Sequence, residues 1–538
     1  MPSNLAGRMA TLLAASLSLW LIFAADAQPP IEGPSAADPA TQERAAQPAK
    51  SREQYETEFL SAMRRGDLDR AEQSLRDWTA GDSQNFVPWY NFACVLSMRG
   101  KLGEAEAALQ RTVIEGFSDL RVLMTDPDLR HLRGTDTYAA IIEGWDRIVD
   151  SRVDAQLESA KKLFRGTPGK PYLFEKDTQL RLAYISAFDP EIFGLAKAEL
   201  AELTRWWHEL VLPTEEPWRT GTAAESAMPD QPREGETDDA KPRPGRQPPW
   251  VMVVLPSRPD YLRWAAAKYG SAGQSVGGAY SHDEKRLVAM DLGSTLRHEY
   301  WHVLHWRHMD QLGQRHPVWV MEGLCSLVED IQPLPEGGFR ALPSWRTNMA
   351  KRLGKGGSLM PWDVLFELDQ KRFVGSKPLA YYAQARAIFM FLADRGKLQD
   401  WYGAYVEGFR KDPTGAAAFE RTFSKPTAEV EKDFRAWLKD VPEVAEEIRP
   451  GMASLPFEIG PGTGDGIVVK STPRGKSGRA SGLRMRDVIT AIDAEPVRDL
   501  NDFARVLGDR LVGEEVKVSY RRGSVHGEVV VKLIRQPE

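Results

Sequence analysis

Apolar residues recur at helical spacing over residues 51–150, without any strand signal. Two segments of this stretch, RRGDLDRAEQSL at 64–75 and MRGKLGEAEAAL at 98–109, match each other with equivalent positions 34 residues apart. In each segment a Gly ends one helix and a small Ala lets the next helix pack closely. This spacing is typical of paired-helix repeats. The pattern therefore predicts an α-helical domain in this part of the chain.

The pattern changes over 166–448, where strand and helix signals alternate. The sequence PWVMVVLPSR at 249–258 predicts a strand, and PDYLRWAAAKYG at 259–270 predicts a helix. A pair of strands is predicted at 277–291, where GGAYSHDEKRLVAMD contains two apolar runs. The alternation predicts an α+β domain.

Short strands and tight turns follow from residue 455 to the end of the sequence at residue 538. The sequence GLRMRDVITAIDAEPV at 482–497 predicts a strand and a turn, and a helix is predicted at 499–507. This part of the chain predicts a separate small domain that is rich in β structure.

Three segments lie outside these domains. Residues 1–27 combine a positive Arg8, an apolar run and an Ala-Asp-Ala end, which predicts a signal peptide and export to the periplasm or the extracellular space. The alternative is an uncleaved membrane anchor, for which the apolar run is short. Residues 28–50 predict a disordered leader, and 213–249, with eight prolines, a disordered insertion.

Composition narrows the classes of function. A length of 538 residues fits about three or four domains. The net charge of −6, from 76 acidic and 70 basic residues, gives no sign of nucleic-acid binding. Two cysteines exclude a disulfide scaffold, and we expect both, Cys94 and Cys325, to be buried. Five of the nine histidines lie between His298 and His316, which makes this segment the best candidate for chemistry.

The sequence LRHEYWHVLHWRH at 296–308 contains the pattern HExxH. His298 and His302 are four residues apart, so on a helix both rings lie on one face and can bind the same metal ion. Glu299 is the next residue after His298 and would face a water molecule held by that ion. The pattern is short and occurs by chance in unrelated proteins, so it needs a third ligand.

Two residues compete to be that third ligand. His308 stands where metzincins have their third histidine, but that pattern requires Gly at the position of His305, where the helix must turn sharply. Glu322 follows His302 by twenty residues, in the apolar sequence HPVWVMEGLCSLVED at 316–330 that predicts a second buried helix. The sequence favours Glu322.

HExxH followed by W-x-x-E-G resembles the gluzincin metallopeptidases of the peptidase MA-like family, over about residues 171–441. The resemblance implies a thermolysin-like α+β fold and one Zn²⁺ per chain, held by His298, His302 and Glu322. It also implies hydrolysis of peptide bonds, with Glu299 as general base for attack by zinc-bound water. An edge strand beside the zinc helix would hold the extended protein or peptide substrate.

This chain departs from the family at one position. Several gluzincins have an acidic residue four positions after the ligand Glu that orients a zinc histidine, whereas this chain has Ser326 there and Glu329 further on. The family often uses a Tyr as oxyanion donor, and Tyr381 and Tyr382 in SKPLAYYAQARAIFMFL are the candidates. The sequence does not choose between them, and Tyr280 is a weaker alternative.

The two outer domains resemble interaction modules. Residues 51–150 resemble tetratricopeptide (TPR) repeats, which would form either a small peptide-binding groove or a cap that packs on its neighbour. Residues 455–538 resemble a PDZ domain, a β-sandwich or barrel with two helices that binds extended peptides by strand addition. The residues expected to form its peptide-binding loop are Leu455, Phe457 and Ile459.

Pro456 lies in the middle of that loop, where PDZ domains commonly have Gly. Because proline has no N–H and a fixed φ, it argues against tight capture of a terminal carboxylate. Binding of internal or exposed hydrophobic segments, and docking of the PDZ domain on the peptidase domain, both stay open.

Together these features predict an exported zinc metallopeptidase with a multidomain α+β fold, made of TPR-like helices, a gluzincin domain and a PDZ domain. Its partners would be a protein or peptide substrate and a peptide ligand of the PDZ domain. No nucleic acid is expected, and membrane contact is expected only if residues 1–27 are retained. The rival prediction is a non-catalytic scaffold that retains the gluzincin fold, for which Ser326 is the argument.

Overall fold

The computed structural model of the chain describes residues 50–164, 166–167, 170–213, 249–269, 278–282, 284–375, 377–471 and 482–537. The predicted signal peptide, all of the leader except Lys50, and all of the insertion except its first and last residues lie outside these ranges. Within them, no helix combines the length and the apolar character that crossing a membrane requires. The chain divides into two compact units, with a boundary between Ala155 and Gln156.

The described residues of the first unit are helical, as expected. Gly66 and Gly100, predicted to be equivalent, both turn the chain with φ near 70°. Their partners Ala71 and Ala105 are both fully buried. The helices are α2 (Arg52–Arg64), α3 (Leu68–Gly81), α4 (Phe86–Met98), α5 (Leu102–Ile114), α6 (Leu120–Thr125), a short η1 (Pro127–Leu129), α7 (Asp136–Glu143) and α8 (Trp145–Leu163), the last of which ends beyond the predicted residue 150.

The second unit contains a five-stranded sheet in the order β3-β4-β5-β7-β6. Strands β4, β5 and β7 are parallel, and the edge strands β3 and β6 run antiparallel to their neighbours. Both faces of β4 and β5 are covered, which explains their continuous apolar sequences. The bounds are β3 (Leu173–Asp177), β4 (Leu182–Ser186), β5 (Trp250–Val254), β6 (Gly278–Ser281) and β7 (Arg286–Ala289), with a separate hairpin of β1 (Gly166–Thr167) and β2 (Lys170–Pro171).

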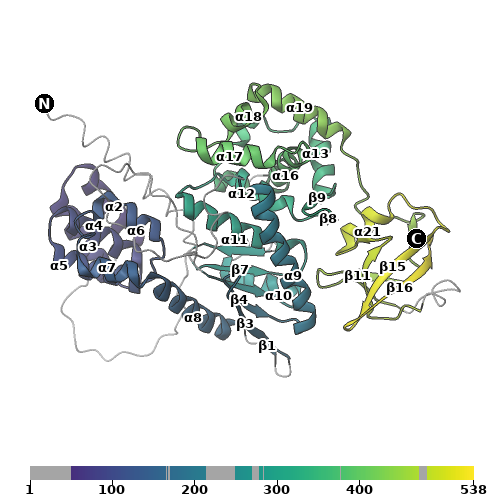
Figure 1. The fold of residues 1–538 in the computed structure, drawn as a ribbon, viewed down its shortest axis with the longest axis horizontal. Helices are drawn as coiled ribbons and strands as arrows, with labels where there is room; N and C mark the ends of the chain where they lie inside the picture. Colours follow the sequence, from purple (N-terminus) through teal and green to yellow (C-terminus); the bar gives the residue numbers. More distant parts are fainter. Residues whose placement is uncertain are drawn as a thin grey trace, which may run out of the picture. The chain divides into compact units, whose positions relative to one another are not determined.

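Helices complete the body that contains this sheet. Alternate residues of the strands, among them Leu182, Trp250 and Leu287, join one hydrophobic core with α9, α11, α12 and α16, teal and green in Figure 1. The helices are α9 (Pro190–Trp206), followed by the π-helical η2 (Trp207–Val211), α10 (Arg258–Tyr269), α11 (Ser294–Leu312), α12 (Val318–Leu327), α13 (Trp345–Lys355), α14 (Trp362–Leu365), α15 (Gln370–Gly375), α16 (Pro378–Asp394), α17 (Leu398–Gly408), α18 (Ala416–Phe423) and α19 (Thr427–Asp440). A hairpin of β8 (Ile331–Pro333) and β9 (Phe339–Ala341) lies between α12 and α13 in the sequence.

The end of the second unit is a β domain with its own core, which includes Ile467, Ile489 and Phe503. One helix, α21 (Leu500–Leu507), lies within its described residues, against two expected; residues 472–481 are outside the description. Asp499 caps α21 as a side-chain acceptor, which agrees with the predicted helix at 499–507. The main sheet has the antiparallel order β11 (Ile459–Pro461), β12 (Ile467–Val469), β13 (Val488–Ile492), β15 (Glu515–Arg522), β16 (Val525–Lys532), with β14 (Glu495–Pro496) beside β13 and a separate pair of β10 (Ala453–Ser454) and β17 (Ile534–Arg535).

Candidate metal centre

Helix α11 carries the HExxH residues and is buried from Leu296 to Met309. Such a helix has no solvent face, and polar residues on it must find partners inside the protein. His298, Glu299 and His302 are all buried, with His302 only 1% exposed. The sequence therefore places three polar side chains in the interior, where their chemistry is separated from bulk water.

Helix α12 brings Glu322 to the same point. Trp319 anchors the helix by stacking on Phe366, with ring centroids 4.1 Å apart. At Gly323 the backbone of α16 is so close that a Cβ would lie 2.9 Å from the carbonyl oxygen of Ala385. Packing thus explains both residues that flank the glutamate in W-x-x-E-G. Trp319 fixes the helix, and Gly323 allows close approach to α16.

The ligand atoms of His298, His302 and Glu322 converge. The Nε2 atoms of His298 and His302 lie 3.1 Å apart. Oε2 of Glu322 lies 3.3 Å from Nε2 of His298 and 3.4 Å from Nε2 of His302. In a tetrahedral site with bonds of about 2.0–2.1 Å, ligand atoms are separated by about 3.3 Å. The three atoms therefore have the spacing of zinc ligands, and no other group of three His, Cys, Asp or Glu side chains in the described ranges converges in this way.

The charges at this point also fit a metal ion. Burial would raise the pKa of Glu322, but His302 and His298 hold it well below its usual range. Burial would lower the pKa of His298, but the carboxylates of Glu322 and Glu329 raise it to about 10. The surroundings thus favour an ionised glutamate and a positive charge beside it, which a divalent cation bound by two neutral imidazoles supplies.

Glu299 lies next to these ligands with an open hydrogen-bonding position. Its Oε2 atom is buried and has no hydrogen-bond partner among the residues described. Burial raises the pKa of Glu299 to about 8. Strand β6 passes directly over the side chain, because a Cβ on Gly278 would lie 2.6 Å from Cγ of Glu299 and 2.7 Å from Cγ2 of Thr295. Glycine at 278 lets the edge strand approach the carboxylate closely.

A second carboxylate supports the ligand His298. Oε1 of Glu329 lies 2.9 Å from Nδ1 of His298, and the Arg346 guanidinium donates to the same carboxylate, with Nη2 2.9 Å from Oε1. Burial would raise the pKa of Glu329, but Arg346 and His298 hold it low. Glu329 thus contacts His298 in the way expected of an acidic residue at position 326, whereas the hydroxyl of Ser326 is buried and without a partner among the described side chains.

The three candidate tyrosines lie in different surroundings. Tyr382 interacts with the Glu322 carboxylate, and burial together with that charge raises the pKa of its hydroxyl well above the usual value. Tyr381 and Tyr382 both pack against Phe373, with ring centroids 5.7 Å and 5.3 Å away, so the Glu322 contact is what distinguishes Tyr382. Tyr280 stacks on the His302 ring, with centroids 4.1 Å apart. Of the two adjacent tyrosines, the geometry favours Tyr382 as the one directed toward the ligands.

The other histidines of the segment form a separate cluster. His305 and His316 are joined by a contact of 2.7 Å between Nε2 and Nδ1, and Nδ1 of His308 lies 2.8 Å from the hydroxyl of Tyr402. Burial lowers the pKa of His305 and of His316 well below the usual value. His308 lies within α11 and is not part of the group that could hold a metal ion, whereas Glu322 is.

The residues expected to form the peptide-binding loop lie at the start of the C-terminal sheet. Leu455 and Phe457 are buried in the core of the β domain, whereas Ile459 is half-buried and begins β11. Pro456 is buried between them. Strand β11 pairs on one side with β12 and has no strand on its other side among the described residues, as strand addition requires.

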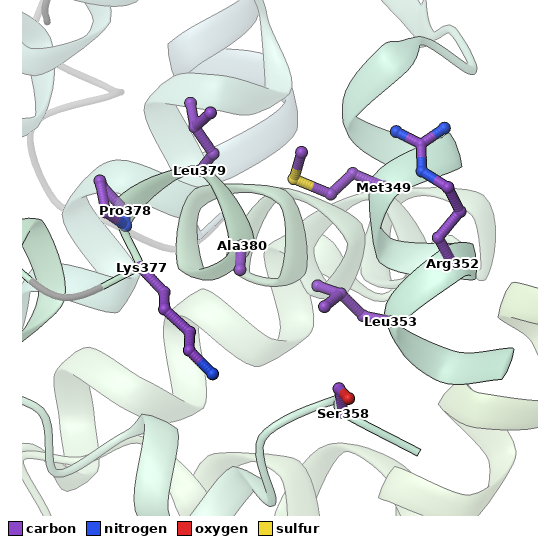
Figure 2. Close-up of a pocket in the computed structure, with 8 residues that line it drawn as sticks. All are labelled: Met349, Arg352, Leu353, Ser358, Lys377, Pro378, Leu379 and Ala380. Atoms are coloured by element: carbon purple, nitrogen blue, oxygen red, sulfur yellow. The ribbon is translucent and has the colours of Figure 1, made fainter. Parts of the chain in front are cut away.

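A pocket of about 490 Å³ lies elsewhere on the second unit (Figure 2). None of the candidate metal ligands, Glu299 or the tyrosines lines it, so it is distinct from the metal centre. Its walls come from α13, the turn after it and the start of α16. The lining residues are Met349, Arg352, Leu353, Ser358, Lys377, Pro378, Leu379 and Ala380.

Two residues of the site were not found from the sequence. Arg346 is 24 residues beyond Glu322 in the sequence and reaches Glu329 only because α13 folds back. Gly278 could have been suspected, since a Gly beside an expected edge strand often marks a close approach of backbone. Nothing in the sequence signals the role of Arg346.

Comparisons with known proteins identify one part of the chain directly. A family model of the PDZ domain matches residues 448–533, slightly earlier than the predicted start at 455. No curated protein sequence matches this chain. The match to the family model covers the β domain whose sheet and α21 are described above.

Solved structures show only distant similarity. An HtrA-type protease, AlgW with decapeptide, is 16% identical over 20% of this chain and 35% of that chain, with a TM-score of 0.15. This chain therefore spans about a third of that protease. An aminopeptidase N family protein from Idiomarina loihiensis is 10% identical over 68% of this chain and 67% of that chain, with a TM-score of 0.24. Both TM-scores are too low to support a fold or an activity, but residues 448–533 form a PDZ domain.

Proposed function

We propose that this chain is an exported zinc metallopeptidase of the gluzincin type. The observation that supports it best is the convergence of His298, His302 and Glu322 at zinc-ligand spacing, beside a buried carboxylate of Glu299. Two imidazoles and one carboxylate are a donor set that zinc prefers in hydrolytic sites, where the fourth position stays open. The three ligands would hold one Zn²⁺ per chain.

Each neighbouring residue has a role that follows from its position. Bound zinc supplies the Lewis acidity that activates water and polarises the scissile carbonyl group. Glu299 accepts a proton at its open Oε2 and later passes it to the leaving amine. Tyr382 donates to the developing oxyanion, and Glu329 holds the ring of His298 in place.

The strand β6 provides the surface for substrate. It ends the five-stranded sheet and has no further strand beside it among the described residues. Because Gly278 brings β6 against Glu299, a peptide added to this edge lies close to the proton acceptor. The substrate is therefore an extended segment of a protein or peptide, bound through its backbone. The PDZ domain binds a further stretch of polypeptide, and the N-terminal helices serve as a TPR-like cap or groove.

The rival function is a scaffold without activity. Its main argument was Ser326, because loss of the supporting carboxylate is expected in a degenerate site. The structure supplies that carboxylate from Glu329 instead, held by Arg346. A buried base and a supported ligand are of no use to a scaffold, so the geometry favours the enzyme.

Metal analysis of purified variants tests the ligand set. We expect about one zinc per chain in the wild type, and less than about a tenth of that in His298→Ala and in Glu322→Gln. His308→Ala is the matched control, because His308 lies on the same helix but outside the convergent group, and it should keep its zinc. Loss of zinc in His308→Ala with retention in Glu322→Gln would overturn the assignment.

A further inference from the structure

The PDZ domain contacts the start of the helix that carries the HExxH residues. The amide N–H of Leu292 donates to the carbonyl oxygen of Thr463, at 2.8 Å, in the loop between β11 and β12. Beside it, a Cβ on Gly464 would lie 2.9 Å from Cα of Gly293. Only two glycines allow backbones to approach this closely. The carboxylate of Asp465 holds the loop on its own domain, by accepting from Arg521 at 2.6 Å.

A second contact joins the same two domains. Arg498, directly before the cap of α21, donates to the carbonyl oxygen of Ile331 at 2.7 Å. Its guanidinium also lies 3.5 Å from the carboxylate of Glu199, on α9. Ile331 follows Glu329 by two residues, so Arg498 reaches the segment that supports His298. Two separate contacts thus fix the PDZ domain on the peptidase domain.

The first contact lies at one end of β11, the strand beside which a peptide is expected to bind. Among the residues that the structure describes, β11 has no strand on its outer edge, and its end at Pro461 leads into the loop that contacts Gly293. Arg498 directly precedes Asp499, the cap of α21. A peptide added antiparallel to β11 has its carboxyl end toward Leu455. Its amino-terminal side therefore leaves the groove near Pro461. The groove therefore opens onto the first turn of α11.

We infer that the edge of β11 in the PDZ domain and the edge of β6 beside the metal centre form one continuous binding track for a single extended polypeptide. The inference rests on the proposed peptidase function. From Gly293, where the PDZ loop touches α11, to Glu299 is six residues, or about 9 Å along the helix. The edge strand β6 begins in this interval, with Gly278 against Thr295 and Glu299. A polypeptide leaving the PDZ groove thus meets the free edge of β6.

The length of this track defines the class of substrate. An extended chain covers about 3.3 Å per residue, so the interval of about 9 Å takes about three residues. About three or four more residues lie along β11 and about four along β6, which gives about ten in total. The substrate is therefore an unfolded polypeptide or a long flexible tail with an apolar segment for the PDZ groove. A peptide of six residues fills only one part of the track.

The length dependence of binding tests the inference without requiring hydrolysis. Two fluorescein-labelled unstructured peptides with a common apolar sequence, of six and sixteen residues, are titrated against the full chain carrying Glu299→Gln, and anisotropy is measured. We expect the longer peptide to bind at least about tenfold more tightly, because its second segment binds intramolecularly. Adding Gly464→Ala should reduce that advantage to less than about twofold.

Matched variants separate the interdomain contact from general damage. Gly513→Ala is the control, because Gly513 also has φ near +90° in the PDZ domain, but a Cβ there meets only the end of Lys532, at 3.8 Å. It should keep the tenfold advantage. Arg498→Gln removes the second contact without backbone strain, and should reduce the advantage like Gly464→Ala. If Gly464→Ala melts at a lower temperature than Gly513→Ala, the result for Arg498→Gln is the one that tests the interdomain contact.

Equal affinity of both peptides for the parent chain would overturn the inference. So would an advantage that survives in both Gly464→Ala and Arg498→Gln. Cleavage of the same peptides by the wild type is measured in parallel. Length-dependent binding without any cleavage contradicts the proposed peptidase function but not the shared track, whereas cleavage without length-dependent binding contradicts the shared track alone.

Discussion

Replacing Glu329 by Gln removes one negative charge 2.9 Å from Nδ1 of His298 while it keeps the shape of the side chain. Nδ1 of the other histidine, His302, contacts no carboxylate among the described residues, so Glu329 is the one carboxylate there that lies against Nδ1 of a candidate ligand ring. Loss of such support typically lowers metal affinity by about 10- to 100-fold. We expect about 100-fold, or about 2.7 kcal/mol, because Arg346 also loses a buried partner.

The zinc affinity is measured by competition with a chromogenic chelator at fixed pH, for the wild type and Glu329→Gln. Glu367→Gln is the control. It removes the same charge, but Glu367 is exposed on the surface. Its affinity should stay within about twofold of the wild type. If Glu329→Gln binds zinc as tightly as the wild type, then His298 does not depend on this carboxylate, and the reasoning about Ser326 is wrong.

Three further substitutions test other parts of the site. Gly278→Ala forces a Cβ toward the Glu299 side chain, and kcat/KM should fall by about 100-fold with zinc content unchanged; normal activity would show that β6 does not confine the carboxylate. Tyr382→Phe should lower kcat by about 100-fold with little change in KM, whereas Tyr381→Phe should match the wild type in steady-state kinetics. A loss of kcat in Tyr381→Phe but not in Tyr382→Phe would exchange their roles. Arg386→Met removes the guanidinium that donates to the buried carbonyl oxygens of Ser326 and Leu342, and urea unfolding should show a loss of about 3 kcal/mol in the free energy of unfolding; a change below about 1 kcal/mol would show that these two hydrogen bonds do not stabilise the fold.

The local part of the site could be read from the sequence. The spacing of His298 and His302 places both on one helix face, and the apolar residues around Glu322 predict a second buried helix. Each of these patterns depends on residues within about one or two turns of helix. In the structure α12 contacts both α11 and α16, and Gly323 allows its close approach to α16.

The parts that depend on distant residues could not be read in this way. Helix α12 ends at Leu327, and Arg297 on α11 then holds the carbonyl oxygen of Val328, at 2.9 Å. This contact, between residues 31 apart, holds the backbone directly before Glu329, whose carboxylate lies against His298, and no helical spacing would have predicted it. Adjacent tyrosines differ by about 100° around a helix axis, so only the packing of α16 could distinguish Tyr381 from Tyr382.

The domain contact shows the same limit. Gly464 lies in a loop whose sequence predicts only a turn, and Gly293 lies at the start of α11, 171 residues earlier in the sequence. Their contact depends on the docking of one folded domain on another. The sequence left docking of the PDZ domain open, and in the structure the amide N–H of Leu292 donates to the carbonyl oxygen of Thr463.

The central claim is that the convergent histidines and glutamate, with Glu299, form a hydrolytic zinc site. Its most direct test compares the wild type with Glu299→Gln, each loaded with about one zinc per chain, on a reduced and unfolded protein substrate. Peptide fragments are identified by mass spectrometry over time. We predict cleavage by the wild type and a rate at least about 1,000-fold lower in the variant, with zinc content unchanged. Equal rates in both proteins, or no cleavage by the zinc-loaded wild type, would contradict the account.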